Sequence, residues 1–224
     1  MRFVTVQKRK SNNSDFCLLT SNFLTMKNIC VFCGSSMGFD KRYEEAAARL
    51  GDVLADNGCT LYYGGGSVGL MNVIADRMLS RGCEVVGVMP DFLLSHEIGH
   101  NGIQKMIPTK TMAERKEILM RESDAFIAMP GGFGTLDEFS EVVVSYQLRL
   151  IDKPVALYNT LGYYDDLVRW IEKGIKEGFV RGDHNKNIIV TDDPKELFQR
   201  LEQYHPVTME KWIHDIKEEL RVES

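Results

Sequence analysis

Short apolar segments and longer amphipathic segments alternate along the chain from residue 28 onward. The short segments are typical of buried strands, and the longer ones, with an apolar residue every three to four positions, are typical of helices. The pattern predicts strands over residues 29–33, 60–63, 84–89, 105–107, 125–129, 154–158 and 188–190. It predicts helices over residues 41–57, 68–80, 111–121, 135–150, 163–177, 194–202 and 209–220, and a loop with some helical turn over 91–104.

Regular strand–helix alternation is typical of α/β proteins in which helices cover both faces of a mainly parallel sheet. Crossover connections in such sheets are right-handed, and ligands bind beyond the carboxyl ends of the strands. The loops that follow the strands are therefore the candidate binding segments. They cover residues 34–38, 64–69, 90–102 and 130–135.

The composition fits one α/β domain with a sizeable core. The chain has 224 residues, of which 44% are hydrophobic and 26% charged, and its net charge is −5. The negative charge argues against nucleic acid as a partner. No apolar run approaches the ~20 residues of a membrane-spanning helix, so we expect no membrane partner.

Residues 1–25 differ in character from the rest of the chain. They are basic near the start, then polar, and only mildly apolar over residues 16–24, where Thr20 and Asn22 interrupt the run. That interruption makes a poor signal-peptide core. We therefore expect three parts: a misassigned start or disordered extension over 1–25, the functional domain over 26–205 and a C-terminal helix over 206–224.

The five cysteines are odd in number and lie mostly in apolar runs, which favours reduced, buried thiols and a cytoplasmic location. Cys30 and Cys33 have the spacing of a redox or zinc pair. Within a strand, however, a separation of three places the two side chains on opposite faces of the sheet. We therefore expect neither metal nor redox chemistry at this pair.

The stretch from Pro130 to Glu138 reads PGGFGTLDE and lies between an expected strand and an expected helix. Its glycines allow close approach of a ligand to the backbone, and the free N–H groups at a helix start suit a phosphate. Glu138 then lies close to the expected phosphate site. An enzyme that develops positive charge on a ribose needs such a carboxylate, whereas a nucleotide carrier does not. The alternative is a capping box, in which Thr135 and Glu138 only cap the helix.

Residues 64–69 read GGGSVG and contain the GxGxxG pattern, with Asp91 about where a dinucleotide fold places its ribose-binding acid. Taken alone, this pattern indicates a nicotinamide enzyme. However, it follows the second expected strand, whereas the dinucleotide fingerprint usually opens the fold. The glycine loop at 131–134 also competes for the phosphate.

His96 to His100 reads HEIGH and matches the HExxH pattern of zinc metalloproteases. Gly99 and the Asn101-Gly102 pair disfavour the long helix that such a site needs, and no third ligand is evident. We therefore expect no metal. Glu97 has an alternative role as a hydrogen-bonding group for a polar ligand above the sheet.

Two further segments carry candidate binding groups. Met112 to Lys116 reads MAERK, and its adjacent Arg115 and Lys116 can clamp an anion; a solvated helix face is the alternative. Ser35 lies in a Gly-Ser-Ser turn after the first strand, where small donors can reach a ligand. An ordinary turn is the alternative for this segment.

Several of these segments, in this order, resemble one family. They look like the Lonely Guy family of cytokinin riboside 5′-monophosphate phosphoribohydrolases, whose members are often labelled lysine decarboxylases. The resemblance covers roughly residues 27–205. The segments that carry it are GGGSVGLM over 64–71, MxxRK over 112–116, PGGxGTxxE over 130–138, CGSS from Cys33, KPV from Lys153 and GYYD from Gly162.

The resemblance implies a Rossmann-like, doubly wound domain, usually a homodimer, that cleaves the N-glycosidic bond of a nucleoside 5′-monophosphate. The products are a free base and ribose 5-phosphate, and no cofactor or metal is needed. Arg115 and Glu138 are then the catalytic pair. The substrate-binding residues expected on this basis are Ser35, Gly65, Gly66, Glu97, Met112, Lys116, Gly131, Gly132, Phe133, Gly134 and Thr135.

The chain departs from the family pattern at Asn72, Ala113, Val144 and Ser145, and Arg149 stands where glycine is common. These departures leave the expected reaction intact but bear on base preference and on the subunit contact. AMP and a cytokinin riboside 5′-monophosphate are both candidate substrates. A molybdenum-cofactor carrier of the same broad fold and a nicotinamide oxidoreductase remain the alternatives.

Overall fold

The computed structural model describes residues 26–96, 98–182, 188–205 and 217. Strands in this part of the chain are β1 (Asn28–Phe32), β2 (Thr60–Tyr63), β3 (Val85–Pro90), β4 (Lys105–Thr109), β5 (Ala125–Ala128), β6 (Val155–Tyr158) and β7 (Ile188–Thr191). They form a seven-stranded sheet in the order β4-β3-β2-β1-β5-β6-β7. Every neighbouring pair in it is parallel.

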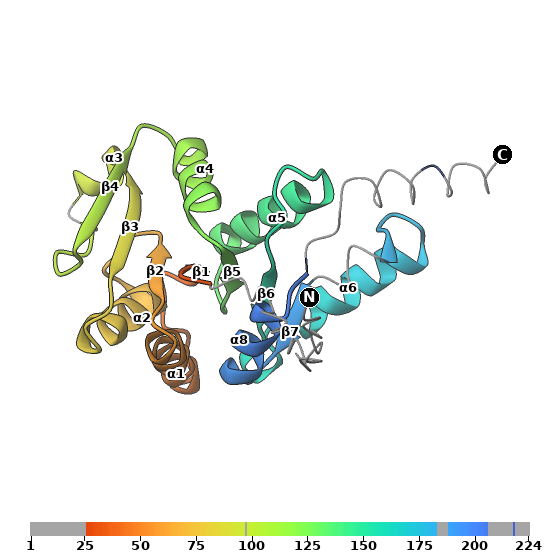
Figure 1. The fold of residues 1–224 in the computed structure, drawn as a ribbon, viewed down its shortest axis with the longest axis horizontal. Helices are drawn as coiled ribbons and strands as arrows, with labels where there is room; N and C mark the ends of the chain where they lie inside the picture. Colours follow the sequence, from red (N-terminus) through yellow and green to blue (C-terminus); the bar gives the residue numbers. More distant parts are fainter. Residues whose placement is uncertain (1–25, 97, 183–187, 206–216, 218–224) are drawn as a thin grey trace, which may run out of the picture.

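Helices cover both faces of the sheet, as Figure 1 shows. One face carries α1 (Arg42–Asp56), α2 (Gly69–Ser80) and α8 (Pro194–Glu202). The other face carries α4 (Met112–Glu122), α5 (Phe133–Gln147) and α6 (Asp165–Lys176). The short helix α3 (Asp91–Leu94) follows β3, and the 3-10 turn η1 (Thr160–Gly162) follows β6.

The chain enters the sheet at its centre and winds in both directions. β2, β3 and β4 follow β1 outward on one side, and the chain then returns to place β5 on the other side of β1. A crevice is expected beyond the carboxyl ends of the strands that flank this reversal. The loops after β1 and β5 meet there, because the Gly34 N–H donates to the Pro130 carbonyl at 3.0 Å. The expected α/β class, a doubly wound parallel sheet with helices on both faces, is confirmed.

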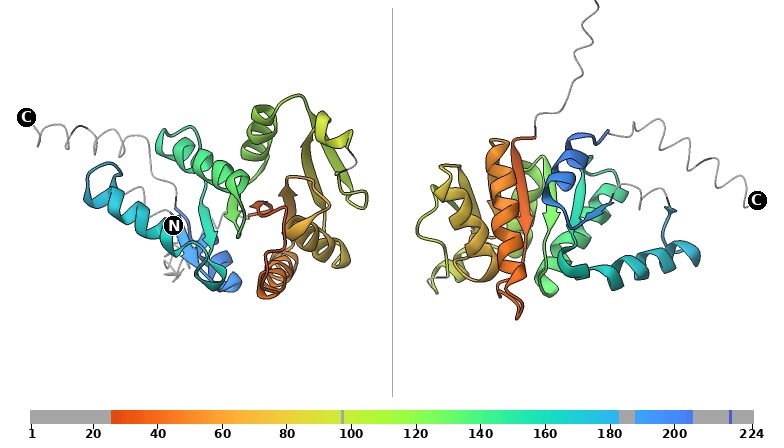
Figure 2. Two further views of the ribbon diagram at one scale, coloured as in Figure 1. Left: turned by 180° about the vertical axis from the view of Figure 1, so that it is seen from behind. Right: turned by 90° about the horizontal axis from the view of Figure 1, so that it is seen from below.

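Side chains at and just beyond β1 alternate between two separate hydrophobic cores. Cys30 lies in the core beneath α4 and α5, whereas Cys33 lies in the core beneath α1 and α2. The two thiols therefore lie on opposite faces, as expected, and both are free. The right view of Figure 2 looks onto the face that α1, α2 and α8 cover.

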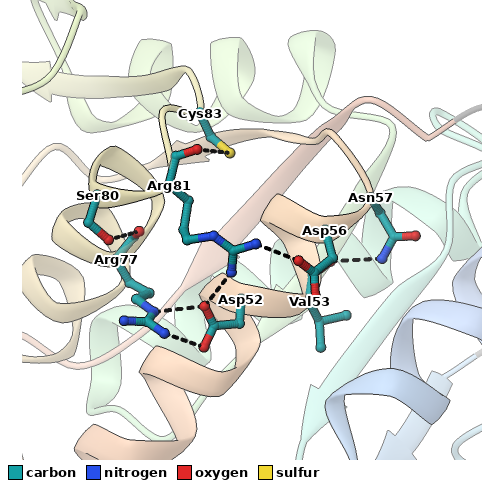
Figure 3. A network of polar contacts seen from close by, with 8 residues as sticks. All are labelled: Asp52, Val53, Asp56, Asn57, Arg77, Ser80, Arg81 and Cys83. Atoms are coloured by element: carbon teal, nitrogen blue, oxygen red, sulfur yellow. Dashed lines mark hydrogen bonds and ion pairs between the residues drawn. The ribbon is translucent and has the colours of Figure 1, made fainter.

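A surface network of ion pairs joins α1 to α2 and is drawn in Figure 3. Asp52 of α1 accepts hydrogen bonds from Arg77 and Arg81, at 2.7 Å in each ion pair. Arg81 also pairs with Asp56 at 2.5 Å. These side chains are partly exposed, so water and salt screen their charges. The network links the two helices at the surface, where exposed ion pairs contribute little to stability.

The ends of the elements agree with the predicted ones within two residues, except at the end of α5. This helix begins at Phe133 and not at Thr135, and it ends at Gln147 and not at Leu150. Its N-cap is Gly132, and no side chain caps it. The alternative in which Thr135 and Glu138 form a capping box is therefore wrong. The first N–H groups of a helix have no intrahelical partner. The first turn of α5 can therefore form within the glycine-rich loop without a side-chain cap.

Some expectations fall on residues that the structure does not describe. These are the N-terminal extension over 1–25, Glu97 and the helix expected over 209–220, apart from Lys217. Within the described ranges, no helix is long and apolar enough to cross a membrane.

Candidate active site

A cavity of about 470 Å³ opens beyond the ends of β1 and β5. Its walls come from the end of β1, the loop after β2, the start of α4 and the start of α5. The cavity thus lies where the winding of the sheet reverses. Among the expected site residues it brings together Ser35, Gly66, Met112, Arg115, Gly132, Phe133, Gly134, Thr135 and Glu138.

Arg115 and Glu138 form a buried ion pair across α4 and α5. The Arg115 Nη1 atom lies 2.6 Å from Glu138 Oε1, and both residues are 8% exposed. The Arg115 Nε–H donates to the Val88 carbonyl of β3 at 3.0 Å, which fixes the guanidinium plane. Gly64 leaves room for the guanidinium, because a Cβ there would lie 2.5 Å from Arg115 Nη2.

The Glu138 carboxylate is desolvated but lies next to a fixed cation. Burial raises the pKa of Glu138 above its ordinary value of 4.5, and the Arg115 guanidinium limits that rise. Away from water, a carboxylate interacts more strongly with positive charge that develops beside it. The pair can therefore hold a carboxylate next to a cationic reaction centre in the cavity.

The glycine loop enters α5 with its backbone close to the first strand's loop. Gly131 has no room for a side chain, because a Cβ there would lie 2.2 Å from Thr135 Oγ1 and 2.9 Å from the Gly34 nitrogen. Gly131 lines an adjoining cavity of about 310 Å³, which shares Ser35 and Gly132 with the larger one. Gly132, the N-cap of α5, lines both cavities. Anions bind at such positions, where helix N–H groups are unpaired.

Lys116 does not line the cavity. Its ammonium pairs with Asp137 at 3.0 Å and with Glu141, both on α5. Hydrogen bonds from the ammonium to the Glu141 and Asp137 carboxylates raise the pKa of Lys116. Arg115 and Lys116 thus tie α4 to α5 through two neighbouring sets of ion pairs.

Gly65 is also absent from the cavity wall. Its backbone has φ +78°, and a Cβ there would lie 2.9 Å from Met106 Sδ. A Cβ on Gly87 would in turn lie 2.7 Å from the Gly65 Cα, so the loop after β2 packs closely against β3. In this structure Gly65 shapes the loop that carries its neighbours Gly64 and Gly66.

Several cavity residues were not among the expected site residues. Asp137, Gly64 and Cys33 line the cavity, as does an apolar wall. Burial, and to a lesser degree the Glu138 charge, raise the pKa of Cys33 well above its ordinary value, which keeps the thiol neutral near pH 7. The apolar wall consists of Val68, Met71, Met89, Leu93 and Ile98. Val68 and Met71 belong to the GGGSVGLM segment, which was the available signal; Met89, Leu93 and Ile98 carry none.

The two histidines of the HEIGH segment have separate partners. His96 Nδ1 lies 2.6 Å from the Phe92 carbonyl, and His100 Nε2 lies 3.1 Å from Asp76 Oδ1. Helix α3 ends at Leu94, before either histidine. Of this segment the structure describes His96 and residues 98–100, and none of these residues is helical.

The GxGxxG segment follows β2 and does not follow the central strand β1. Its third glycine, Gly69, has φ +59°, and a Cβ there would lie 2.3 Å from the Ser35 carbonyl carbon. The Leu70 N–H donates to the Gly34 carbonyl at 3.0 Å. The start of α2 thus packs directly against the loop after β1.

The fold and the cavity define a doubly wound α/β protein with a glycine-loop site at the β1–β5 switch point. A family model described as "Possible lysine decarboxylase" matches residues 71–201. A probable cytokinin riboside 5′-monophosphate phosphoribohydrolase of Oryza sativa subsp. japonica is 43% identical over 83% of this chain and 78% of that protein. A cytokinin riboside 5′-monophosphate phosphoribohydrolase of Arabidopsis thaliana is 43% identical over 80% and 84%. The chain therefore belongs to the Lonely Guy family, as its motifs predicted.

Solved structures share the fold at lower identity. The molybdenum cofactor binding protein of Rippkaea orientalis has a TM-score of 0.60 and 22% identity, over 80% of this chain and 96% of that chain. The molybdenum cofactor carrier protein of Chlamydomonas reinhardtii has a TM-score of 0.59 and 20% identity, over 80% and 96%. At this level of identity, the likeness describes the fold alone.

Proposed function

We propose that this protein hydrolyses the N-glycosidic bond of a nucleoside 5′-monophosphate and releases a free base and ribose 5-phosphate. The observation that carries the proposal is the buried Glu138 carboxylate, paired with Arg115 and facing a cavity at the start of α5. Relatives at 43% identity carry the name of this activity, with cytokinin riboside 5′-monophosphates as substrates.

The geometry suggests how the substrate lies. Its 5′-phosphate accepts hydrogen bonds from the N–H groups of the glycine loop and the first turn of α5, with Thr135 and Ser35 close by. Its ribose lies near Glu138, and its base lies against the apolar wall, where the thioethers of Met71 and Met89 adapt to a flat ring. Met112 borders the same space, and we keep Glu97 as a ligand-contacting group.

Bond cleavage in this reaction develops positive charge on the sugar. The ionised Glu138 carboxylate stabilises that charge and orients or deprotonates the water that attacks the anomeric carbon. The C–N electrons leave with the base, which takes up a proton. Arg115 stays protonated and holds Glu138 and the substrate by hydrogen bonds, and Lys116 anchors the neighbouring part of α5. These steps require no metal or cofactor.

A substrate panel tests the proposal. Purified protein is incubated with AMP, an isopentenyladenosine 5′-monophosphate, adenosine, ATP and NAD, and ribose 5-phosphate is measured. We expect release from the monophosphates. Tight binding without turnover would favour the carrier alternative, and specific NAD(H) binding would favour the oxidoreductase; either result contradicts the proposal.

Glu138→Gln keeps the size of the side chain and removes its charge. We expect kcat to fall by roughly 10²-fold or more while the circular dichroism spectrum stays unchanged. Glu45→Gln, on the exposed surface of α1, is the charge-matched control and should keep full activity. Full turnover by the Glu138→Gln variant would rule out the assigned role of this carboxylate.

We further infer that the protein is a homodimer that works in the cytoplasm. Apolar side chains gather on the outer surface of α5 and α6, where Leu136 is 38%, Val144 48% and Trp170 67% exposed. An apolar groove of about 210 Å³ runs between the same helices. A second copy would cover this α5–α6 face.

The four described cysteines are free, which agrees with a reducing compartment such as the cytoplasm.

A further inference from the structure

The turn after β6 is built rigidly and presents two adjacent tyrosines. Leu161 and Gly162 both have left-handed backbone angles, with φ 57° and 70°. The Asn159 side chain donates to Asp165 Oδ1 at 2.8 Å and accepts from the Tyr164 N–H at 2.7 Å. The turn is therefore held by side-chain hydrogen bonds at both of its ends.

Both tyrosine hydroxyls donate to carbonyl groups of the glycine loop. Tyr163 Oη lies 2.5 Å from the Gly131 oxygen, and Tyr164 Oη lies 2.6 Å from the Met129 oxygen. The two rings meet edge to face with centroids 5.0 Å apart, and the Tyr43 ring of α1 packs on Tyr163 in the same way at 6.1 Å. The aromatic contacts leave the hydroxyls little freedom to turn away.

The carbonyl between these two is also bonded, because Pro130 accepts from the Gly34 N–H at 3.0 Å. Three consecutive carbonyls of the loop, at residues 129, 130 and 131, thus each accept a hydrogen bond from another segment. In a trans peptide the N–H points away from the carbonyl of the same plane. Fixing the carbonyls of Pro130 and Gly131 therefore fixes the directions of the Gly131 and Gly132 N–H groups.

These two N–H groups have no protein acceptor among the described residues. They come directly before the first turn of α5, whose N–H groups are also free at a helix start. An anion at this position would meet donors that are already oriented, so binding would cost little conformational entropy.

We propose that Tyr163 and Tyr164 are positioning residues that orient the Gly131–Gly132 amides for the 5′-phosphate of the substrate. This inference rests on the proposed function and adds a specific source of phosphate affinity to it. Tyr164 is 7% exposed and belongs to the core beneath α5, whereas Tyr163 is 45% exposed. Removal of the Tyr163 hydroxyl should therefore affect the loop with little effect on folding.

The test compares a ligand that carries the phosphate with one that does not. In Tyr163→Phe we expect the inhibition constant of ribose 5-phosphate and the KM of the monophosphate substrate to rise about 2- to 10-fold, the effect of one hydrogen bond. The inhibition constant of free adenine should stay within about 2-fold, because adenine carries no phosphate. The value of kcat should also stay within about 2-fold, because the lost interaction is the same in the ground and transition states. Tyr164→Phe should show the same selectivity together with a lower unfolding midpoint.

Tyr43→Phe is the matched control, because its ring packs on Tyr163 but its hydroxyl makes no hydrogen bond to the loop. It should leave all four constants unchanged. Unchanged ribose 5-phosphate affinity in Tyr163→Phe, or equal losses for ribose 5-phosphate and adenine, would overturn the positioning role and leave the hydrolase proposal standing. A wild-type protein that neither binds ribose 5-phosphate nor hydrolyses any monophosphate would overturn both.

Discussion

Burial and a fixed positive charge act in opposite directions on the Glu138 carboxylate. Burial dominates and raises the pKa of Glu138, while Arg115 at 2.6 Å keeps the ionised form accessible. Removing either partner leaves the other buried and unpaired, which is more costly than losing a surface pair. The balance suits a group that must be ionised during turnover and desolvated enough to act on a nearby cation.

The raised pKa of Glu138 makes stability depend on pH in a defined direction. The folded protein holds the Glu138 proton more tightly than the unfolded chain does, so the contribution is full below about pH 4.5, the ordinary carboxyl value. It is lost as pH rises through the folded-state pKa. We expect the unfolding free energy of the wild type, relative to Glu138→Gln, to fall across this interval in urea titrations at a series of pH values.

The Asp40 carboxyl group affects the folding stability in a different pH interval. Hydrogen bonds from Arg42 lower the pKa of Asp40 to about 2, so its contribution changes below the Glu138 interval. The difference between wild type and Glu138→Gln cancels such terms. A pH-independent difference above pH 4.5 would contradict the raised pKa.

Sequence reasoning at this scale proposed the Arg115–Glu138 pair but not the partners of Lys116. PGGxGTxxE and MxxRK pointed to Glu138 and Arg115, because their chemistry is visible in the residue types. The pairing of Lys116 with Asp137 and Glu141 was not predicted. It depends on the distance between α4 and α5, and no local pattern encodes that distance.

At the scale of the elements, both ends of α5 differ from their predicted positions. The helix begins inside the glycine loop, with Gly132 as N-cap, and ends at Gln147. Two residues later, Arg149 has φ 58°, a left-handed conformation that is unfavourable for residues other than glycine. The Arg149 guanidinium lies over the Tyr146 ring, with Cζ 5.1 Å from the ring centroid. Arg149 Nη1 lies 3.8 Å from Asp152 Oδ1.

The conformation of Arg149 predicts an order of stability for two variants. Arg149→Gly and Arg149→Ala both lose the arginine contacts, but only alanine keeps the left-handed strain. We expect Arg149→Ala to be less stable than Arg149→Gly by about 1 kcal/mol in denaturant unfolding. Equal stabilities would contradict a left-handed conformation at residue 149.

The exact end of α5 was not readable from the chain because no glycine or proline marks it. The amphipathic pattern continues through Leu148 and Leu150, which are in fact exposed, at 61% and 73%. By contrast, both ends of α8 were predicted correctly. Its start is marked locally by Asp193 and Pro194.

At the scale of the whole molecule, the strand order places the site. β1 and β5 are neighbours although α1, β2, α2, β3, α3, β4 and α4 separate them along the chain. Their loops meet through Gly34 and Pro130, and the start of α2 packs on the same point through Gly69. The cavity is thus assembled from segments that are distant in sequence.

The α5–α6 face predicts association between copies of the chain. Trp170 is 67% exposed beside an apolar groove, an arrangement that a partner surface would cover. We expect the wild type to sediment as a dimer and Trp170→Asp to shift towards monomer at the same concentration, because a charge there would be buried in the contact.

Phe39→Asp serves as the control, since Phe39 is fully exposed in the loop before α1 and does not line the apolar groove between α5 and α6. It should not change the sedimentation of the protein. A wild type that stays monomeric over the full concentration range, or a Trp170→Asp variant that stays dimeric, would contradict this assignment of the interface.

The sequence by itself determined the α/β class, the family and nearly all element boundaries to within two residues, and it predicted the candidate reactive residues. Each of these is encoded locally, in hydrophobic period, turn residues or the spacing of functional groups within one segment. Only the tertiary structure decided that Glu138 is buried against Arg115, that Lys116 is held by α5, and that two tyrosines hold the glycine loop. Those contacts join segments that are far apart in the chain, so they exist only once the sheet has brought its strands together.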